Sequence, residues 1–308
     1  MQNQSVLEYL KNLYKRSGAV GKLIAVSLVV HLLFGIAYGI ERLFIHPELF
    51  TEFFDGYVMK FKAEWFAAPG NPSELVYKPW TIVTQLFGHA GILHLLFNMV
   101  ALFFTARLFV QFFGERRLVS TYFLAGIFAY FFHITCYYTI PEFQAQAGVG
   151  LIGASGAVMG IFVAAAVHRP NLQVLLFGAI KLPLILIAGI YVLYNVATIF
   201  ENDGVGRVAH LGGALFGAIS VINVNSPKNF MNRFDKWLSK FKWPSFKRKP
   251  KMKVYKNDAK TMNDDEYNSN RQDYQKRVDA ILDKISKKGY EGLSKEEKEI
   301  LFNESKRK

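Results

Sequence analysis

The sequence predicts an all-α membrane protein with six transmembrane helices and a basic cytoplasmic tail that contains short helices. Hydrophobic residues make up 51% of the 308 positions, and several apolar runs approach the roughly 20 residues with which a helix crosses a bilayer. The basic residues are concentrated in the last part of the chain, where residues 226–308 contain 23 of the 37 Lys and Arg residues. We therefore divide the chain into a membrane domain, residues 1–225, and a tail, residues 226–308.

Six apolar segments are candidate spans. They cover about Val20–Ile40, Ile92–Phe113, Leu118–Tyr138, Leu151–Val167, Leu182–Phe200 and Val208–Val224. The fourth and sixth are short and rich in Gly and Ala, so a buried helix that does not fully cross is the alternative for each. A cleaved signal peptide is the alternative for the first, but small residues at a cleavage site are missing.

The basic residues around the spans predict the orientation. Lys11, Lys15, Arg16 and Lys22 lie before or at the start of the first span, and the basic tail follows the sixth. Because Lys and Arg near span ends favour the inner side, both termini are expected in the cytoplasm. Spans two, four and six then start at the same, outer side. The expected location is the cytoplasmic (inner) membrane of a bacterium.

The long external connection, about Glu41–Gly88, is rich in aromatic residues at spacings of three and four. They are Phe50, Phe53, Phe54, Tyr57, Phe61, Trp65 and Phe66. This pattern is typical of a helix in the headgroup layer, and it is equally compatible with an ordinary packed loop.

Polar side chains at membrane depth are costly, so each is a functional candidate. His94 and Asn98 open the second span, Ser155 opens the fourth, and His210 opens the sixth. Topology places all of them at one depth. Each also has a simpler interpretation, since an isolated Ser usually bonds the preceding turn and an isolated His often joins helices.

Small residues favour contact between the fourth and sixth spans. Gly156 and Gly160 form one small-xxx-small step, and Ala209, Gly213 and Gly217 form two more; such steps let helix backbones approach closely in lipid. If these faces meet, the serine of span four and the histidine of span six come within reach of one another. A serine beside a histidine base is the minimum for nucleophilic acyl transfer.

The same depth offers groups that stabilise an oxyanion. Ser155 lies near a helix start, where free N–H groups and the helix dipole favour negative charge. His94 and Asn98 are four apart and share one helix face, so their side chains could donate to the same charge.

The other candidate residues are assigned structural roles. His89 is expected to bond the loop before span two, and His31 and His133 are expected in the packed core. Cys136 is the only cysteine, which excludes an internal disulfide. We expect it to pack as a small apolar side chain.

No metal, cofactor or nucleic acid is expected. A metal site of His89, His94 and His210 is conceivable, but no acid or cysteine lies near them in the pattern to complete it. The basic excess directly follows the last apolar segment, where it more often faces anionic lipid than nucleic acid.

Three motifs on alternate spans occur in a fixed order. They are His94-x-x-x-Asn98, Gly153-Ala154-Ser155-Gly156 and Ala209-His210-x-x-Gly213-x-x-x-Gly217, within about Tyr77–Val224. This ordered set resembles the rhomboid family of intramembrane serine proteases. The resemblance implies a Ser155 nucleophile, a His210 base, and an oxyanion hole formed by His94, Asn98 and the Ser155 amide. It also implies transmembrane protein substrates, cut near the outer surface and admitted laterally near spans two and five.

The sequence departs from the family pattern in several places. Met159 stands where members often carry an aromatic residue on the base, Val110 where they often carry an acid, and Phe66 follows Trp65 in place of an arginine. No Asp or Glu lies within spans two, four or six, so the dyad is expected to fix its histidine tautomer by packing, without a third triad residue.

Two other classes of protein remain as alternatives to a serine endopeptidase. One is an inactive rhomboid-like protein that binds or guides membrane clients; the joint presence of Ser155, His210, His94 and Asn98 argues against it. The other is a transporter of a small polar solute, although the internal repeats typical of transporters are not visible between the two halves.

The tail is predicted to begin with a helix at Ser226-Pro227. Its apolar face comprises Phe230, Phe234, Trp237, Leu238 and Phe241, a pattern typical of a helix on the inner leaflet. A linker is expected at about Pro244–Asn270 because it is polar and charged.

Two short helices are predicted after the linker, at about Asp273–Lys287 and Lys295–Asn303. Ser294 and Glu297 form a capping box. An apolar stripe of Val278, Ile281, Leu282 and Ile285 is expected to pack on Leu293, Ile300, Leu301 and Phe302. A core of this size is marginal alone, and we expect it to dock on a partner or on the membrane domain. The tail as a whole is expected to contact anionic lipid or a cytoplasmic partner.

Overall fold

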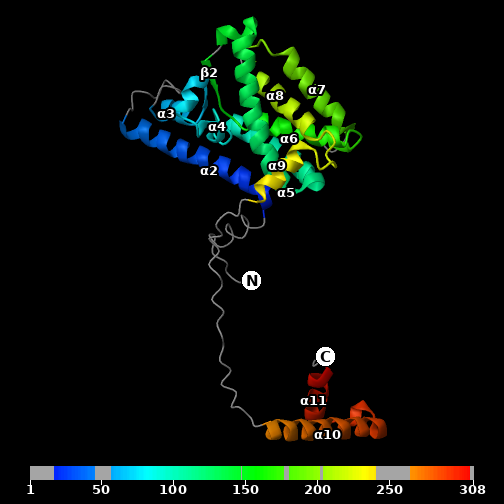
Figure 1. Cartoon of the computed structure of the whole chain (residues 1–308). Helices are drawn as coiled ribbons and strands as arrows, with labels where there is room; N and C mark the ends of the chain where they lie inside the picture. The colour runs from blue at the N-terminus through cyan, green and yellow to red at the C-terminus, as the bar shows by residue number, and fades with distance from the viewer. Residues whose placement is uncertain are drawn as a thin grey trace. The chain divides into compact units, whose positions relative to one another are not determined.

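The computed structural model describes residues 17–45, 57–146, 148–176, 180–201, 204–240 and 264–305. The chain divides into two compact units, Met1–Trp243 and Pro244–Lys308. Both are mostly helical in their described parts (Figure 1).

The described elements of the first unit confirm a mainly helical fold. Its helices are α2 (Gly18–Ile40), α3 (Tyr57–Trp65), α4 (Thr81–Thr84), α5 (Ile92–Thr139), α6 (Ser155–His168), α7 (Leu184–Ala197), α8 (Gly204–Ser220) and α9 (Phe230–Leu238). A π-helical turn covers Glu41–Ile45, and 3-10 turns cover Pro72–Val76 and Pro141–Gln146. Strands β1 (Ala68–Gly70) and β2 (Gly148–Leu151) form one antiparallel pair, and β3 (Gln173–Leu176) and β4 (Ile180–Pro183) form another. The prediction of an all-α fold did not include these four short strands.

Two of the described helices, α2 and α5, are long and apolar enough to cross a membrane, and α6 and α7 are shorter apolar helices. All six predicted apolar segments overlap helices. The second and third lie within α5, where Gly114 has a φ of 77° and interrupts the helical backbone between them. Because glycine adopts this conformation without steric cost, the break falls at the predicted connection.

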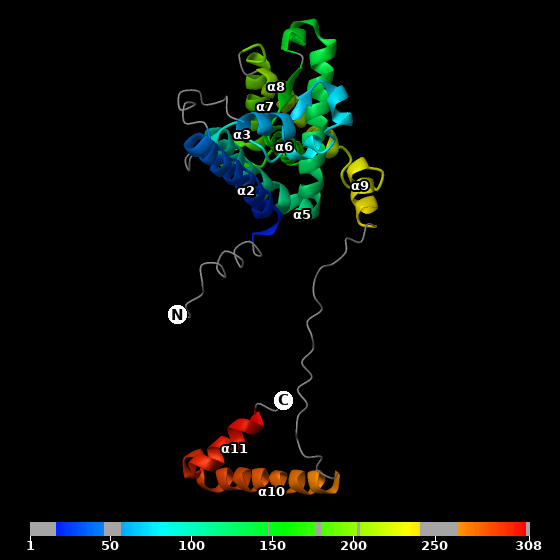
Figure 2. The ribbon, with the colours of Figure 1, turned by 90° about the vertical axis from the view of Figure 1, so that its left-hand side faces the viewer.

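The centre of the first unit is α6, which lies between α5 and α8 (Figures 1 and 2). Ten of its 14 residues are buried. A Cβ atom on Gly160 would stand 3.1 Å from the backbone oxygen of Gly213, and one on Gly156 would stand 3.5 Å from that of Ala209. The predicted contact between the small-residue faces of α6 and α8 is confirmed.

The fourth apolar segment was predicted to be helical from Leu151, which is too early. Leu151 pairs with Ala68 in the β1–β2 ladder, and Gly153 has a φ of 135°. The helix therefore begins only at Ser155. Hydropathy does not reveal this boundary, because the strand is held by a partner about eighty residues away in the sequence.

The last two apolar segments also differ from their predicted bounds. Pro183 has extended backbone and precedes the first residue of α7. α8 begins before the charged Arg207, which is only 7% exposed and forms an ion pair of 3.2 Å with Glu201. Since this charge is paired, it does not end the helix as hydropathy suggested.

The described part of the external connection packs against α2 and the segment before α5. The rings of Phe34 and Phe66 meet edge to face at 4.7 Å, and Lys62, 4% exposed, donates a hydrogen bond to the backbone oxygen of His89. These contacts agree with the packed alternative, but Tyr57–Trp65 is helical and its Phe61 and Trp65 are 51% and 39% exposed, as expected of a helix in the headgroup layer. Phe50, Phe53 and Phe54, which belong to the predicted aromatic pattern, lie outside the described residues.

The helix α9 belongs to the first unit, so the boundary between units follows Trp243 rather than residue 225. Met231 is fully buried against the α5 and α8 side chains Ala125 and Phe216. The carboxylate of Asp235 lies 2.6 Å from Nε of Arg117 in α5.

The start of α9 also differs from the prediction. Residues 221–229 form turns, and the Asn229 side chain caps the helix by accepting from the Asn232 amide at 3.1 Å. The helix therefore begins at Phe230, after the predicted Ser226-Pro227 start, because the side-chain acceptor lies at Asn229.

The second unit contains α10 (Asp264–Lys288), a 3-10 turn (Tyr290–Gly292) and α11 (Lys295–Ser305). The two predicted tail helices are confirmed, although α10 begins inside the predicted linker; residues 244–263 of that linker lie outside the described residues. The capping box is confirmed by both of its hydrogen bonds, Ser294 amide to Glu297 at 2.7 Å and Glu297 amide to Ser294 Oγ at 3.2 Å. Val278 and Ile281 of the apolar stripe are buried, but Leu282 is 49% exposed, and Phe302, on which the stripe was expected to pack, is 58% exposed.

Candidate active site

The structure brings together the four polar side chains predicted at the starts of spans two, four and six. A cavity of about 330 Å³ is lined by His94, Asn98, Ser155 and His210. A second cavity, of about 500 Å³, shares His94, Ser155 and His210 with the first. These residues lie up to 116 positions apart in the sequence, so their meeting is a property of the fold.

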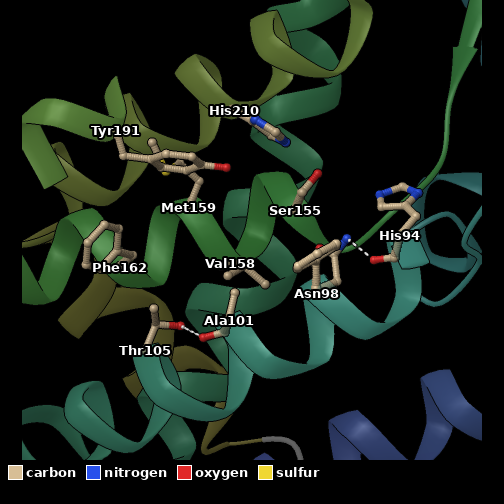
Figure 3. A pocket seen from close by; sticks show the side chains of 11 residues that line it. His94, Asn98, Ala101, Thr105, Ser155, Val158, Met159, Phe162, Tyr191 and His210 are labelled. Atoms are coloured by element: carbon tan, nitrogen blue, oxygen red, sulfur yellow. Dashed lines mark hydrogen bonds between the residues drawn. The ribbon is translucent and has the colours of Figure 1, made fainter. Parts of the chain in front are cut away.

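Ser155 is the first residue of α6, and its hydroxyl points toward the His210 ring of α8 (Figure 3). The close packing of α6 on α8 sets this approach, since neither helix carries a side chain between the backbones at the glycine contacts. The first N–H groups of a helix have no partner within it. The backbone amides at Ser155 and Gly156 therefore supply donors beside the hydroxyl.

His94 packs against the backbone that precedes Ser155. A Cβ atom on Gly153 would stand 2.8 Å from Cε1 and 2.9 Å from Nε2 of His94, so only glycine leaves space for the ring. The Ala90 amide donates to Nδ1 of His94 at 3.4 Å. This bond makes Nδ1 the acceptor and leaves Nε2 as the N–H donor in the neutral ring, on the side of Gly153.

Asn98 is held one turn further along α5. Its Nδ2 donates to the His94 backbone oxygen at 2.9 Å, and the side chain is 6% exposed. An amide nitrogen carries two hydrogens, so the second can serve another acceptor at the cavity. His94 and Asn98 therefore present donors near the amide of Ser155.

His89 has the structural role that was predicted for it. The ring is fully buried, and its Nδ1 lies 3.2 Å from the Phe87 backbone oxygen. Burial lowers the pKa of the His89 imidazole to about 3. The ring is therefore uncharged at neutral pH, and it packs edge to face on His94 at 5.2 Å.

The sequence interpretation missed Asn195. Its Oδ1 lies 2.8 Å from Nδ1 of His210, and the side chain is 1% exposed. The prediction that packing alone fixes the histidine tautomer was therefore wrong, because a hydrogen bond reaches the ring. Asn195 is the only Asn, Gln, Asp or Glu within Leu182–Phe200. Because polar residues at membrane depth are functional candidates, this position could have been identified from the sequence.

Tyr191 was also missed. Its ring lies 6.4 Å from that of His210, tilted by 31°, while Met159 is buried with Val163 and Ala214. An aromatic neighbour for the histidine therefore comes from α7 rather than from the turn after Ser155.

Among the residues that the structure describes, no group of three or more His, Cys, Asp or Glu side chains is arranged to hold a metal ion. The site instead combines a hydroxyl, an imidazole and several N–H donors around one cavity of a mainly helical unit. That arrangement defines a membrane-embedded protein whose cavity has the parts needed for acyl transfer.

Comparison with known proteins gives the family. Residues 77–225 match the Rhomboid domain, and residues 262–307 match a family of unknown function (DUF6576). Residues 77–225 therefore form a domain of the rhomboid family.

Three relatives show the range of proteins that the chain resembles. It is 29% identical over 154 residues to Rhomboid protease AarA of Providencia stuartii (46% of this chain, 54% of the relative). It is 30% identical over 151 residues to the mitochondrial RHOMBOID-like protein 12 of Arabidopsis thaliana (46% and 45%). It is 37% identical over 76 residues to Inactive RHOMBOID-like protein 8 of the same plant (24% and 22%). The chain thus spans about half the length of the first two.

Proposed function

We propose that this protein is an intramembrane serine endopeptidase that hydrolyses peptide bonds of transmembrane protein substrates. The observation that carries the proposal is the meeting of Ser155 and His210, from α6 and α8, in one cavity with His94 and Asn98. A binding protein or a transporter has no need of a hydroxyl, a base and oxyanion donors around one point.

The proposed reaction follows the geometry. His210 takes the hydroxyl proton as Ser155 Oγ attacks the substrate carbonyl, and the negative charge develops on the carbonyl oxygen. Donors from His94, Asn98 and the Ser155 amide stabilise that charge. His210 then gives the proton to the leaving amine, and water releases the acyl group by the same route.

The proposal includes the membrane arrangement predicted from the sequence. Six spans, cytoplasmic termini and an outward-facing site place the cavity near the outer surface of a bacterial cytoplasmic membrane. The exposed apolar side chains of α2, among them Leu32 and Leu33 at 61% and 62%, support contact with lipid tails. The basic residues of the tail suit anionic lipid at the inner surface.

A serine-directed phosphonate tests the proposal on the purified full-length protein. We expect one covalent adduct, mapped to Ser155, that disappears in Ser155→Ala and is strongly reduced in His210→Ala. Because groups that act as a unit are not additive, the double variant should be as inactive as Ser155→Ala alone. Ser239→Ala, which removes an exposed hydroxyl at the end of α9, is the matched control.

A folded wild-type protein that forms no adduct and cuts no membrane substrate would instead support the client-binding alternative. Cleavage by purified Ser155→Ala protein would also contradict the proposal.

A further inference from the structure

We propose that Asn195 is a positioning residue that holds His210 in the tautomer required of a general base. The inference rests on the proposed function and extends it from two residues to three. It starts from the two hydrogen bonds made by one buried amide.

The first bond fixes the orientation of the amide group. Nδ2 of Asn195 donates to the backbone oxygen of Tyr191 at 2.8 Å. A carbonyl oxygen only accepts, so the group facing Tyr191 must be the NH₂ end. Oδ1 therefore faces His210.

The second bond fixes the protonation of the ring. Oδ1 of Asn195 lies 2.8 Å from Nδ1 of His210, and an amide oxygen can only accept. Nδ1 must therefore carry the hydrogen in the neutral ring, which puts the lone pair on Nε2. This is the nitrogen with which His210 takes the proton from Ser155.

The burial of Asn195 makes its bond to His210 costly to break, so the bond can hold the tautomer of the ring. Asn195 is 1% exposed, and a buried polar group left without a partner costs more free energy than the bond itself contributes. Turning the ring or moving the hydrogen to Nε2 would break this bond and remove the donor that faces the buried amide oxygen. The amide thus resembles the buried acid of a triad in position, but it carries no charge.

The two neighbours of His210 come from one element. Tyr191 and Asn195 are four residues apart on α7, so the helix presents the ring and the amide on one face. α7 therefore positions the base, while α6 carries the nucleophile.

The experiment compares three variants by phosphonate labelling and substrate cleavage across pH. In Asn195→Ala we expect the labelling rate and kcat to fall about ten- to a hundredfold, with KM little changed. Thr198→Val, at the residue that follows α7, is the control. It removes a similar bond to the preceding turn, Oγ1 to the Tyr194 backbone oxygen at 2.6 Å, and should label like wild type.

Asn195→Asp tests the role of Asn195 through the pH–rate profile, which would not shift if this residue only stabilised the fold. The carboxylate keeps the acceptor and favours the charged imidazolium, so activity should persist and the midpoint of the pH–rate profile should move to higher pH. The other ionisable or charged side chains lining the two cavities are His94 of α5, Tyr191 and Tyr194 of α7, and Arg207 of α8. They are the same in every variant.

The outcomes separate the two proposals. A wild-type protein without an adduct contradicts the proposed function. A wild-type protein that labels, together with Asn195→Ala labelling at the same rate per folded molecule, overturns the role of Asn195. An unshifted pH midpoint in folded Asn195→Asp does the same; if that variant does not fold, the rate of Asn195→Ala against Thr198→Val decides.

Discussion

The α-carbon of Gly213 in α8 lies against the backbone oxygen of Gly156 in α6, so closely that a Cβ atom on Gly213 would overlap that oxygen. The same relationship recurs one turn later between Gly217 and Gly160. Two helix backbones in direct contact set the separation of Ser155 and His210. The glycines are therefore part of the construction of the site, although they take no part in its chemistry.

Replacing Gly213 with Val should force the two helices apart. Overpacking commonly costs about 1–3 kcal/mol, and we expect the upper end because the obstacle is backbone. Thermal unfolding in detergent would measure the loss, and labelling of Ser155 should fall with it. Gly189→Ala in α7 is the control, because a Cβ atom there meets nothing within 4 Å; equal stability of the two variants would contradict the argument.

Removing an oxyanion donor should slow cleavage without abolishing labelling. Loss of one such donor typically costs about 10²–10³ in turnover, and we expect this range for Asn98→Ala, with Ser155 still labelled by the phosphonate. Thr135→Val is matched to it, since it removes another bond to the preceding turn of α5, at 2.8 Å and on an exposed face. Unchanged turnover in both Asn98→Ala and His94→Ala would rule out the oxyanion assignment.

Removing the second unit should leave the membrane unit intact only if the chain is cut after α9. A chain that ends at Trp243 keeps Met231 in its pocket and the Arg117–Asp235 pair, so its melting temperature and labelling should match the full chain. A chain that ends at Asn225 loses both. Breaking a buried ion pair lowers the stability by about 3–5 kcal/mol, and breaking an exposed pair lowers it by about 1 kcal/mol or less. The side chains of Arg117 and Asp235 are 12% and 16% exposed, so we expect a loss of stability between these values.

Equal melting temperatures for the two truncated chains would show that α9 does not stabilise the membrane unit. Loss of activity in the longer one, with an intact core, would mean that the second unit completes the enzyme.

Acidification should open the α10–α11 unit through Glu297. Hydrogen bonds from Lys284, and then from the Ser294 amide, lower the pKa of this carboxyl from its ordinary value of 4.5. A depressed pKa in the folded state means that the stabilisation is present above the ordinary value and is lost as pH falls through the lower one. Hydrogen exchange of α10 and α11 in the full chain should show this loss of protection. Glu297→Gln should be less protected at neutral pH and less sensitive to acid, whereas Glu296→Gln should behave like wild type.

The sequence by itself was sufficient to predict the helical membrane unit, the four polar residues of the candidate site and the contact between α6 and α8. These features are local or periodic: apolar runs have a length, small residues have a spacing, and polar residues in apolar runs are conspicuous. The capping box of Ser294 and Glu297 was predictable for the same reason, because its two bonds join residues three apart.

Only the tertiary structure decided the partners of those residues. The β1–β2 ladder moves the start of α6 to Ser155, and Asp235 reaches Arg117 across 118 positions. The hydrogen bond that Nδ1 of His210 donates to Oδ1 of Asn195 joins two helices whose sequences show no sign of pairing. Such contacts depend on how helices rotate and tilt against one another, which follows from the packing of all of them together. The sequence therefore determined which groups are present at the site, and the packing determined which of them holds the histidine.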